Sequence, residues 1–173
     1  MGVFNTNENQ ERVQIIEKML TYKINLENSF DDLIVELVNY YHNTDQTIYA
    51  DNVLADPING LKDLNDVNYE NSYEAYLITQ IKLAILLPSA IEGHVRMLNM
   101  GDNIDSVLEL FELKAYDIKK NIYSNLGEWE LVLDHIDDER ISEITCNPKG
   151  HGDLLLKELL WIRKCEKKHN RNV

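Results

Sequence analysis

Histidine and cysteine, the side chains that most often hold transition metals, are few in this sequence and widely spaced. Among 173 residues there are five histidines and two cysteines, with no Cys-x-x-Cys and no two histidines four residues apart. The best candidate metal site combines His42, at the predicted end of the first helix, with His135 and Glu139. Residues 135 and 139 would share one face of a helix because they are four apart. The alternative is a plain exposed acidic helix, and we expect no cofactor.

One early histidine joined to a pair on a later helix resembles the arrangement in DinB-like helical bundles, where the pair is HxxxH. The resemblance implies a metal centre built from His42, His135 and Glu139. Here Glu139 stands where that family has its second histidine. A metal- or ligand-binding bundle is therefore the third function that we consider.

Arg163 and His169 form a second candidate pair near the end of the chain, within the stretch LLWIRKCEKKHN. Arginine followed by five residues and a histidine resembles the closing helix of HEPN domains, which are all-α bundles. The resemblance implies that His169 handles a ribose 2′-hydroxyl proton and that Arg163 stabilises the charged phosphate, usually across a dimer. Glu92 and Arg96, in AIEGHVRML, are similar to the pattern of a mid-domain HEPN helix. The alternative for the C-terminal pair is a solvated basic helix end that complements the helix dipole.

Motifs for nucleophilic catalysis and phosphate binding are absent from the sequence. There is no GxSxG and no glycine-rich phosphate loop, and the seven glycines are scattered. The two cysteines give no disulfide framework, which is typical of a reducing cytoplasm. We therefore expect a cytoplasmic protein that acts by binding rather than as an enzyme.

Acidic and tyrosine side chains gather around residues 45–70, where the chain carries six acids against the single basic residue Lys62. Aromatic side chains with a polar tip favour interfaces, and complementary charge speeds association. The sequence therefore predicts a binding surface for a basic protein. Its members are Tyr40, Tyr41, Asp45, Tyr49, Asp51, Asp56, Asp63, Asp66, Tyr69 and Glu70. The alternative is that the tyrosines pack at the edge of the bundle.

The net charge of the chain is -13, with an isoelectric point near 4.7. Such an excess of acids argues against a general nucleic-acid binder. The charge is polarised, however, because residues 149–173 hold seven basic and three acidic residues. This basic end leaves RNA binding or a homodimer open.

Apolar residues recur every three or four positions, and no stretch alternates as a strand would, so the sequence predicts one all-α domain over residues 1–173. We expect five to seven helices. Residues 1–9 form a loose leader, and residues 10–43 form a long helix or two in line with a break at 25–29. The apolar stripe of this helix packs within the chain or forms a coiled-coil-like dimer seam. Residues 45–70 form a long connection with one or two short helical turns.

A largely buried helix follows, starting with Ser72 as its cap and running to residue 87, where Pro88 ends, kinks or restarts it. Its apolar run over 76–91 is too interrupted for a membrane span, so we expect a core helix. The next stretch closes at Gly101.

The remaining segments are also helical. A helix capped at residues 102–103 ends at Gly127, an acidic helix covers 128–139, and the last helix begins near His151. Residues 163–173 should form its exposed basic end.

The sequence thus favours a small acidic cytoplasmic protein that acts by binding, without membrane association. We expect an inhibitor or neutraliser of a basic partner such as a toxin, nuclease or defence effector, that is, an immunity, antitoxin or anti-defence protein. The asparagine- and isoleucine-rich composition is typical of AT-rich bacterial or phage genes. The alternative is a HEPN-like ribonuclease or regulatory relative that uses Arg163 and His169.

Overall fold

One long helix, α1 (Thr6–Asn43), spans the protein, and the next two α-helices of the chain pack on it. It is continuous in the computed structural model, which describes residues 6–68, 70–124 and 127–169. Neither glycine nor proline occurs within it, so residues 25–29 do not break it. The prediction of a loose leader over 1–9 is wrong from Thr6 onward, because the helix begins there. Residues 1–5 lie outside the described residues.

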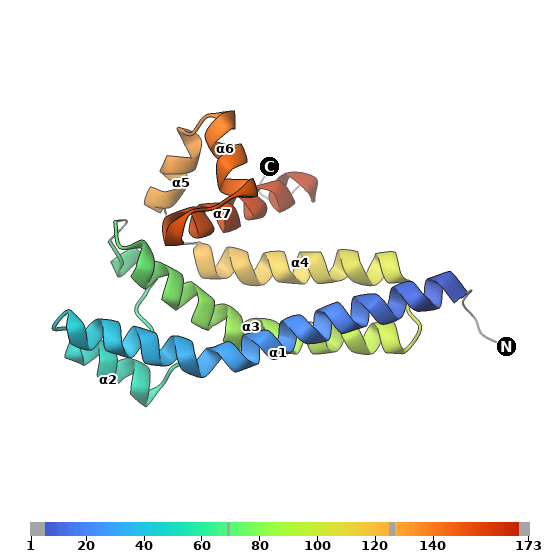
Figure 1. Cartoon of the computed structure of the whole chain (residues 1–173), viewed down its shortest axis with the longest axis horizontal. Helices are drawn as coiled ribbons and strands as arrows, with labels where there is room; N and C mark the ends of the chain where they lie inside the picture. The colour runs from blue at the N-terminus through green and yellow to red at the C-terminus, as the bar shows by residue number, and fades with distance from the viewer. Residues whose placement is uncertain (1–5, 69, 125–126, 170–173) are drawn as a thin grey trace.

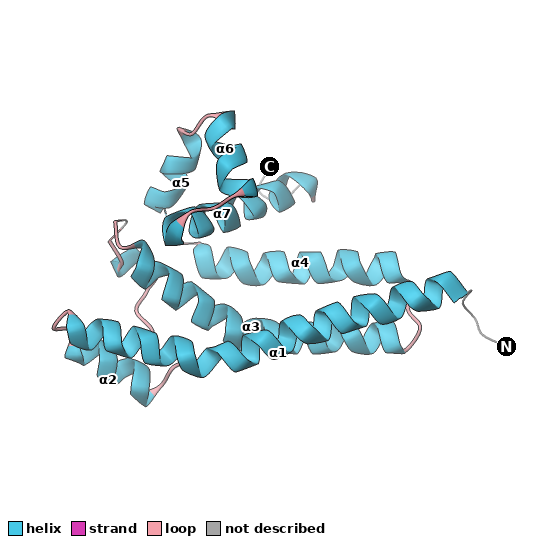
Figure 2. Cartoon of the chain, in the orientation of Figure 1, coloured by secondary structure: helices cyan, strands magenta, loops and turns pink. Residues whose placement is uncertain are grey.

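Helices account for the secondary structure throughout, and the described part of the chain contains no strand (Figure 2). After α1 come α2 (Thr47–Ala55), the short 3-10 helix η1 (Leu64–Asp66), α3 (Ser72–Asn99), α4 (Ile104–Tyr123), α5 (Gly127–Asp134), α6 (Asp138–Cys146) and α7 (Gly150–Lys168). The prediction of an all-α fold with five to seven helices is confirmed, since seven α-helices form in the described residues.

The apolar helix α3 occupies the centre of the bundle. It contacts α1, α4 and α7, while α2 folds back onto α1, and α5 and α6 rest on α7 (Figure 1). A single core cluster runs through these helices, from Met19 in α1 to Cys165 in α7. The apolar stripe of α1 is therefore used for packing within the chain.

Pro88 lies inside α3 without ending it. The helix changes direction along its length in Figure 1, which fits the loss of one backbone hydrogen bond at a proline. Its N-cap is Asn71, whose side chain accepts a hydrogen bond from the Glu74 N–H at 3.1 Å, rather than Ser72. By length and composition α3 could cross a membrane, but 61% of its most apolar window is buried inside the protein.

The C-terminus of α3 is closed by Gly101 and held by α1. Gly101 has a φ of 89°, and its N–H donates to the Leu98 carbonyl while the Asp102 N–H donates to the Met97 carbonyl. The prediction that Gly101 closes this helix is confirmed. The buried Arg12 of α1 also donates from Nη1 to the carbonyls of Leu98 and Asp102, at 2.9 and 2.8 Å. Carbonyls at a helix end, which need partners, thereby bind the first helix to the third.

The helix α4 begins as predicted, after Asn103 accepts a hydrogen bond from the Ser106 N–H at 3.0 Å. It ends at Tyr123, so the prediction that Gly127 ends it is wrong. Gly127 is instead the first residue of α5.

The predicted acidic helix over 128–139 is wrong, because it is interrupted. Asp137 is extended, with φ −82° and ψ 171°, and its side chain accepts a hydrogen bond from the Arg140 N–H at 2.8 Å. It therefore caps a new helix, α6, instead of continuing α5. The last helix starts at Gly150, one residue before the predicted start.

The predicted connection 45–70 is more helical than expected, because residues 47–55 form α2. The loop after α2 folds tightly back on it, and the Gly60 N–H donates to the Asp56 carbonyl at 2.6 Å. A Cβ at residue 60 would lie 2.0 Å from the Asn52 carbonyl oxygen and 2.5 Å from that of Asp56. Only glycine allows this approach.

A matched pair of glycine substitutions tests this packing. Gly60→Ala should lower the free energy of unfolding by about 1–3 kcal/mol, because backbone atoms must move. Gly93→Ala, in the middle of α3 where a Cβ meets nothing within 4 Å, should raise it by about 0.5–1 kcal/mol. Urea denaturation measures both. Two changes of the same sign would contradict the packing described here.

Candidate functional site

The connection between α1 and α3 presents acidic and apolar side chains together. Only Ala50 and Val53 of α2 are buried, so the rest of this helix faces outward. Three large apolar side chains are well exposed, with exposed fractions of 76% for Ile48, 59% for Leu54 and 66% for Ile58. We call this region the α2 surface. Its members are Asp45, Ile48, Tyr49, Asp51, Leu54, Asp56, Ile58, Asp63 and Asp66.

Part of the predicted acidic set lines one hollow on the α2 surface. Tyr49, Asp56, Asp63 and Asp66 lie around a depression of about 500 Å³. The carboxylate of Asp56 also fixes its own loop, because it accepts hydrogen bonds from the Ile58 and Asn59 N–H groups at 3.1 and 3.2 Å. The Asn59 side chain also donates from Nδ2 to Asp56 Oδ2 at 3.0 Å, and this bond, followed by the backbone bonds, holds the pKa of Asp56 below its ordinary value. Asp56 therefore contributes a negative charge to the hollow at neutral pH.

Other predicted members of the binding surface lie outside this hollow. Asp45 and Asp51 are exposed outside the lining of the hollow, and Glu70 lines a different cavity. Asp45 adopts a positive φ of 58° at the C-terminus of α1, a position at which glycine is more usual. Tyr69 lies outside the described residues.

Lys62, the single basic residue of this segment, is turned inward. Its side chain is only 10% exposed, and its Nζ lies 3.0 Å from Glu74 Oε2 and 3.4 Å from Gln46 Oε1. The same atom sits 4.3 Å from the centre of the Tyr49 ring. Its charge is matched within the fold, so the charge that this segment exposes is negative.

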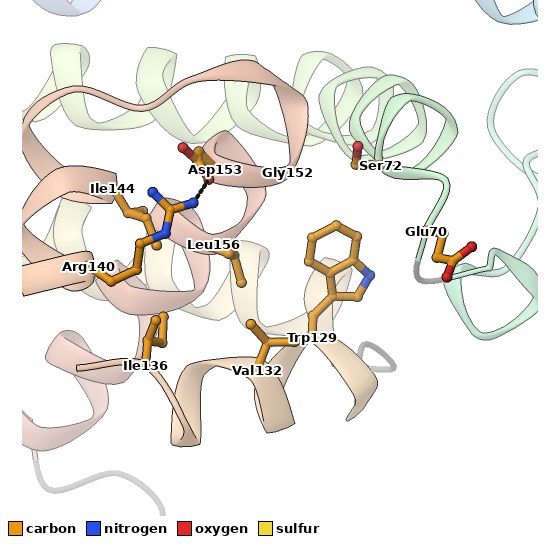
Figure 3. Close-up of a pocket in the computed structure, with 10 residues that line it drawn as sticks. All are labelled: Glu70, Ser72, Trp129, Val132, Ile136, Arg140, Ile144, Gly152, Asp153 and Leu156. Atoms are coloured by element: carbon orange, nitrogen blue, oxygen red, sulfur yellow. Dashed lines mark hydrogen bonds and ion pairs between the residues drawn. The ribbon is translucent and has the colours of Figure 1, made fainter.

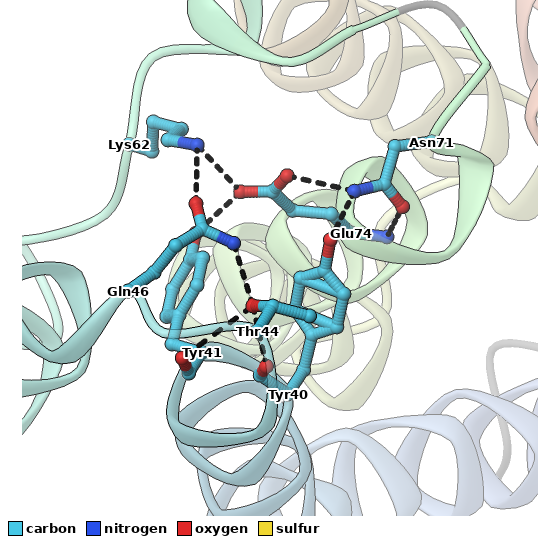
Figure 4. Close-up of polar contacts among 7 residues, drawn as sticks. All are labelled: Tyr40, Tyr41, Thr44, Gln46, Lys62, Asn71 and Glu74. Atoms are coloured by element: carbon cyan, nitrogen blue, oxygen red, sulfur yellow. Dashed lines mark hydrogen bonds and ion pairs between the residues drawn. The ribbon is translucent and has the colours of Figure 1, made fainter.

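Tyr41 is fully buried and donates from its hydroxyl to Glu74 Oε2 at 2.8 Å (Figure 4). Burial, followed by the hydrogen bond and the charge of Glu74, raises the pKa of Tyr41 well above its ordinary value. The prediction that Tyr41 belongs to a binding surface is wrong. Tyr40 is half-buried, accepts a hydrogen bond from Asn71 Nδ2 and packs edge-on against Tyr73, with ring centres 5.7 Å apart. Both tyrosines follow the alternative of packing at the edge of the bundle.

The carboxylate of Glu74 is the centre of this network. Glu74 is 3% exposed, and besides Tyr41 and Lys62 it accepts a hydrogen bond from Asn71 Nδ2 at 3.0 Å. A charge this deep is tolerated only when it is paired and hydrogen-bonded. The network therefore joins the end of α1, the loop at Lys62 and the start of α3.

Removing one partner of Glu74 tests this role. Lys62→Met should lower the free energy of unfolding by about 3 kcal/mol, because the buried carboxylate loses its counter-charge. Adding Glu74→Gln in the Lys62→Met background should recover much of the loss, because an amide carries no charge and still accepts from Tyr41. Urea denaturation of both variants measures this, and a double variant less stable than the single one would contradict it.

Arg163 and His169, the pair suggested by the HEPN resemblance, face different neighbours. Arg163 Nη2 lies 2.7 Å from Asp134 Oδ1 of α5, whereas His169 Nε2 lies 3.3 Å from Glu112 Oε1 of α4. The structure does not bring the two together within one chain. Glu92 and Arg96 are exposed on α3 and lie 3.6 Å apart. A HEPN-like activity stays a prediction.

The candidate metal ligands are not assembled. His135 lies in the turn between α5 and α6 and Glu139 lies within α6, so the break at Asp137 removes the shared helix face. His42 is exposed near the end of α1. Over residues 6–68, 70–124 and 127–169, no three histidine, cysteine or acidic side chains form a group that could hold a metal.

The sequence does not predict the cluster around Glu112, because the other members lie more than fifty residues after it in the chain. Glu112 accepts hydrogen bonds from Lys168 at 3.0 Å and from Cys165 at 3.5 Å, and it contacts His169. Burial alone would raise the pKa of Glu112, but the hydrogen bonds from Lys168, His169 and Cys165 outweigh it and lower this pKa. Burial and Glu112 raise the pKa of Cys165 to about 11.

The predicted exposed basic end over 163–173 is exposed at its described lysines, although Cys165 within it is buried. Arg163 and Lys168 are tied to acids on α5 and α4, which neutralises part of its charge. Lys164 and Lys167 are exposed as predicted. Residues 170–173 lie outside the described residues.

The Glu112 cluster predicts a pH-dependent stability. Because the folded pKa of Glu112 lies below its ordinary value of 4.5, its contribution is complete above that pH and is lost as pH falls through the folded pKa. Glu112→Gln should cost about 1 kcal/mol or less at pH 7, and the difference from wild type should shrink on acidification. Thermal unfolding from pH 7 to pH 3 measures it. Glu109→Gln, an exposed neighbour on the same helix, should show no such trend, and an equal trend in both variants would contradict the assignment.

Comparison with known proteins gives no match, whether to a family model, to a curated protein or to a solved structure. The geometry described above is therefore what supports a functional proposal.

Proposed function

We propose that this protein acts by binding a basic protein partner through the α2 surface, as an inhibitor or neutraliser in the cytoplasm. The observation that carries the proposal is the charge of this surface. Its acids are turned outward or line the hollow, while Lys62 is turned inward onto Glu74. A surface of this kind attracts basic proteins and repels acidic ones.

Apolar side chains supply the second requirement of a binding surface. Ile48, Leu54 and Ile58 are among the most exposed large apolar residues of the described chain. Stable interfaces combine an apolar centre with a polar or charged rim. The α2 surface holds both within about twenty residues of sequence, which supports a protein partner over a simple counter-ion.

The hollow on the α2 surface suits a basic side chain. Its lining includes three carboxylates, the ring of Tyr49 and Lys62, whose charge is matched by Glu74. Arginine pairs with carboxylates through two parallel hydrogen bonds and stacks on aromatic rings. An arginine or lysine of the partner would therefore gain charge pairing and ring contact together.

Basic surfaces are typical of proteins that act on nucleic acid, because they must neutralise phosphates. Covering such a surface with acidic side chains blocks access to the nucleic acid. A toxin, nuclease or defence effector therefore fits as partner, and the chain would then act as an immunity, antitoxin or anti-defence protein.

A charge-reversal experiment tests the proposal. The protein is used to capture its partner from the native host, and the affinity of the recovered partner is measured by calorimetry. Asp51→Lys with Asp66→Lys should weaken binding at least tenfold, because two attractive charges become repulsive. Raising the salt concentration should also weaken it.

The control is Glu17→Lys with Glu109→Lys, two exposed acids outside the α2 surface whose reversal changes the net charge equally. It should change the affinity less than threefold. Recovery of no basic partner, or equal weakening by both double variants, would overturn the proposal.

A further inference from the structure

A second cavity, separate from the α2 surface, lies between the start of α3 and the α5–α7 region (Figure 3). Its volume is about 320 Å³, within the range of small-ligand sites. Trp129, Val132, Ile136 and Leu156 form apolar walls, so a short apolar body would be desolvated there.

Arg140, at one end of this cavity, already has its charge matched. Its Nη2 lies 2.7 Å from Asp153 Oδ1, and its Nη1 lies 3.3 Å from Glu143 Oε2. Asp153, which is 7% exposed, also accepts a hydrogen bond from the Lys149 N–H at 2.9 Å. An anionic ligand would have to compete with two carboxylates for this guanidinium.

Glu70 lines the end opposite Arg140, and in Figure 3 the indole of Trp129 lies between these two side chains. Its backbone N–H donates to Asn68 Oδ1 at 3.0 Å, but its carboxylate makes no hydrogen bond or ion pair with the described residues. A cation here would meet a carboxylate and an aromatic ring together, both of which attract positive charge. Of the three charged residues that line the cavity, Arg140 and Asp153 pair with each other, whereas Glu70 has no oppositely charged partner among the described residues.

We propose that this cavity binds a small amphipathic organic cation, with its ammonium or guanidinium group beside Glu70 and its short apolar body against Trp129, Val132 and Leu156. An anion is disfavoured at both ends, by Glu70 at one and by the matched Arg140 at the other. This proposal does not depend on the α2 surface, because the two sites share no lining residue.

The test uses n-pentylamine as the probe, with pentanoate and pentan-1-ol as its anionic and neutral counterparts. Binding is followed by NMR through the indole N–H signals of the two tryptophans, which Trp161→Phe distinguishes. We expect a saturable shift of the Trp129 signal with pentylamine, with a dissociation constant on the order of millimolar for a ligand of this size. Pentanol should bind at least threefold more weakly, and pentanoate should not bind.

Two variants locate the site. Glu70→Gln should weaken pentylamine binding about threefold or more and leave pentanol binding unchanged, because exposed charge pairs contribute modestly. Gly152→Leu should abolish binding of both, because Gly152 lines the cavity next to Ser72, where a Cβ at residue 152 lies 3.8 Å from that of Ser72, and a longer side chain takes up space in the cavity. Glu109→Gln removes one exposed charge elsewhere and should change nothing.

The source of the cation is tested with Nα-acetyl-lysine methylamide, whose binding would show that a lysine side chain of a polypeptide also fits. Failure of that probe alone would assign the cavity to free amines. Absence of a saturable Trp129 shift with pentylamine, equal binding of pentanoate, or unchanged affinity in Glu70→Gln would overturn the proposal. None of these outcomes bears on capture of a protein by the α2 surface.

Discussion

A carboxylate buried in an apolar core must be given a counter-charge and hydrogen-bond donors, and Glu74 imposes that requirement on this protein. Its partners Tyr41, Lys62 and Asn71 come from the end of α1, the loop after α2 and the N-cap of α3. Satisfying one side chain therefore fixes three segments. The α2 segment, which lies between Tyr41 and Lys62, is held at both ends as a result.

This constraint also shapes the outer face of the connection. Because Lys62, which also lines the hollow, pairs with the buried Glu74, its charge does not offset the carboxylates of that surface. Because α2 buries only the small side chains of Ala50 and Val53, its larger apolar residues remain outside. The acidic and apolar character of the α2 surface thus follows from which side chains the interior takes up. The composition of the segment counts Lys62 against its acids and does not show which apolar residues are exposed.

The helical pattern was predictable where one face is apolar over many turns, as in α1 and α4, since periodicity reports burial directly. The prediction of one helix over residues 128–139 is wrong because Asp137, which lies within a run of acidic residues, caps a new helix through its side chain. The site was harder to predict. Counting charges cannot show that Lys62 pairs with Glu74, or that Glu112 gathers Lys168 and His169, because these partners meet only once the helices pack. The prediction for Tyr41 is wrong for the same reason, since a tyrosine at a helix end is equally compatible with an exposed surface and with a buried hydrogen bond.

The hydrogen bonds from Arg12 to the end of α3 bear on the order of folding. Its acceptors at Leu98 and Asp102 lie 86 and 90 residues further along the chain. During synthesis, the start of α1 has nothing to close against until α3 and its terminal turn have formed. Contacts of such long sequence separation cost more loop-closure entropy than local ones. We infer that the N-terminal end of the longest helix is fixed in place only after the end of α3 has formed, although it is made first.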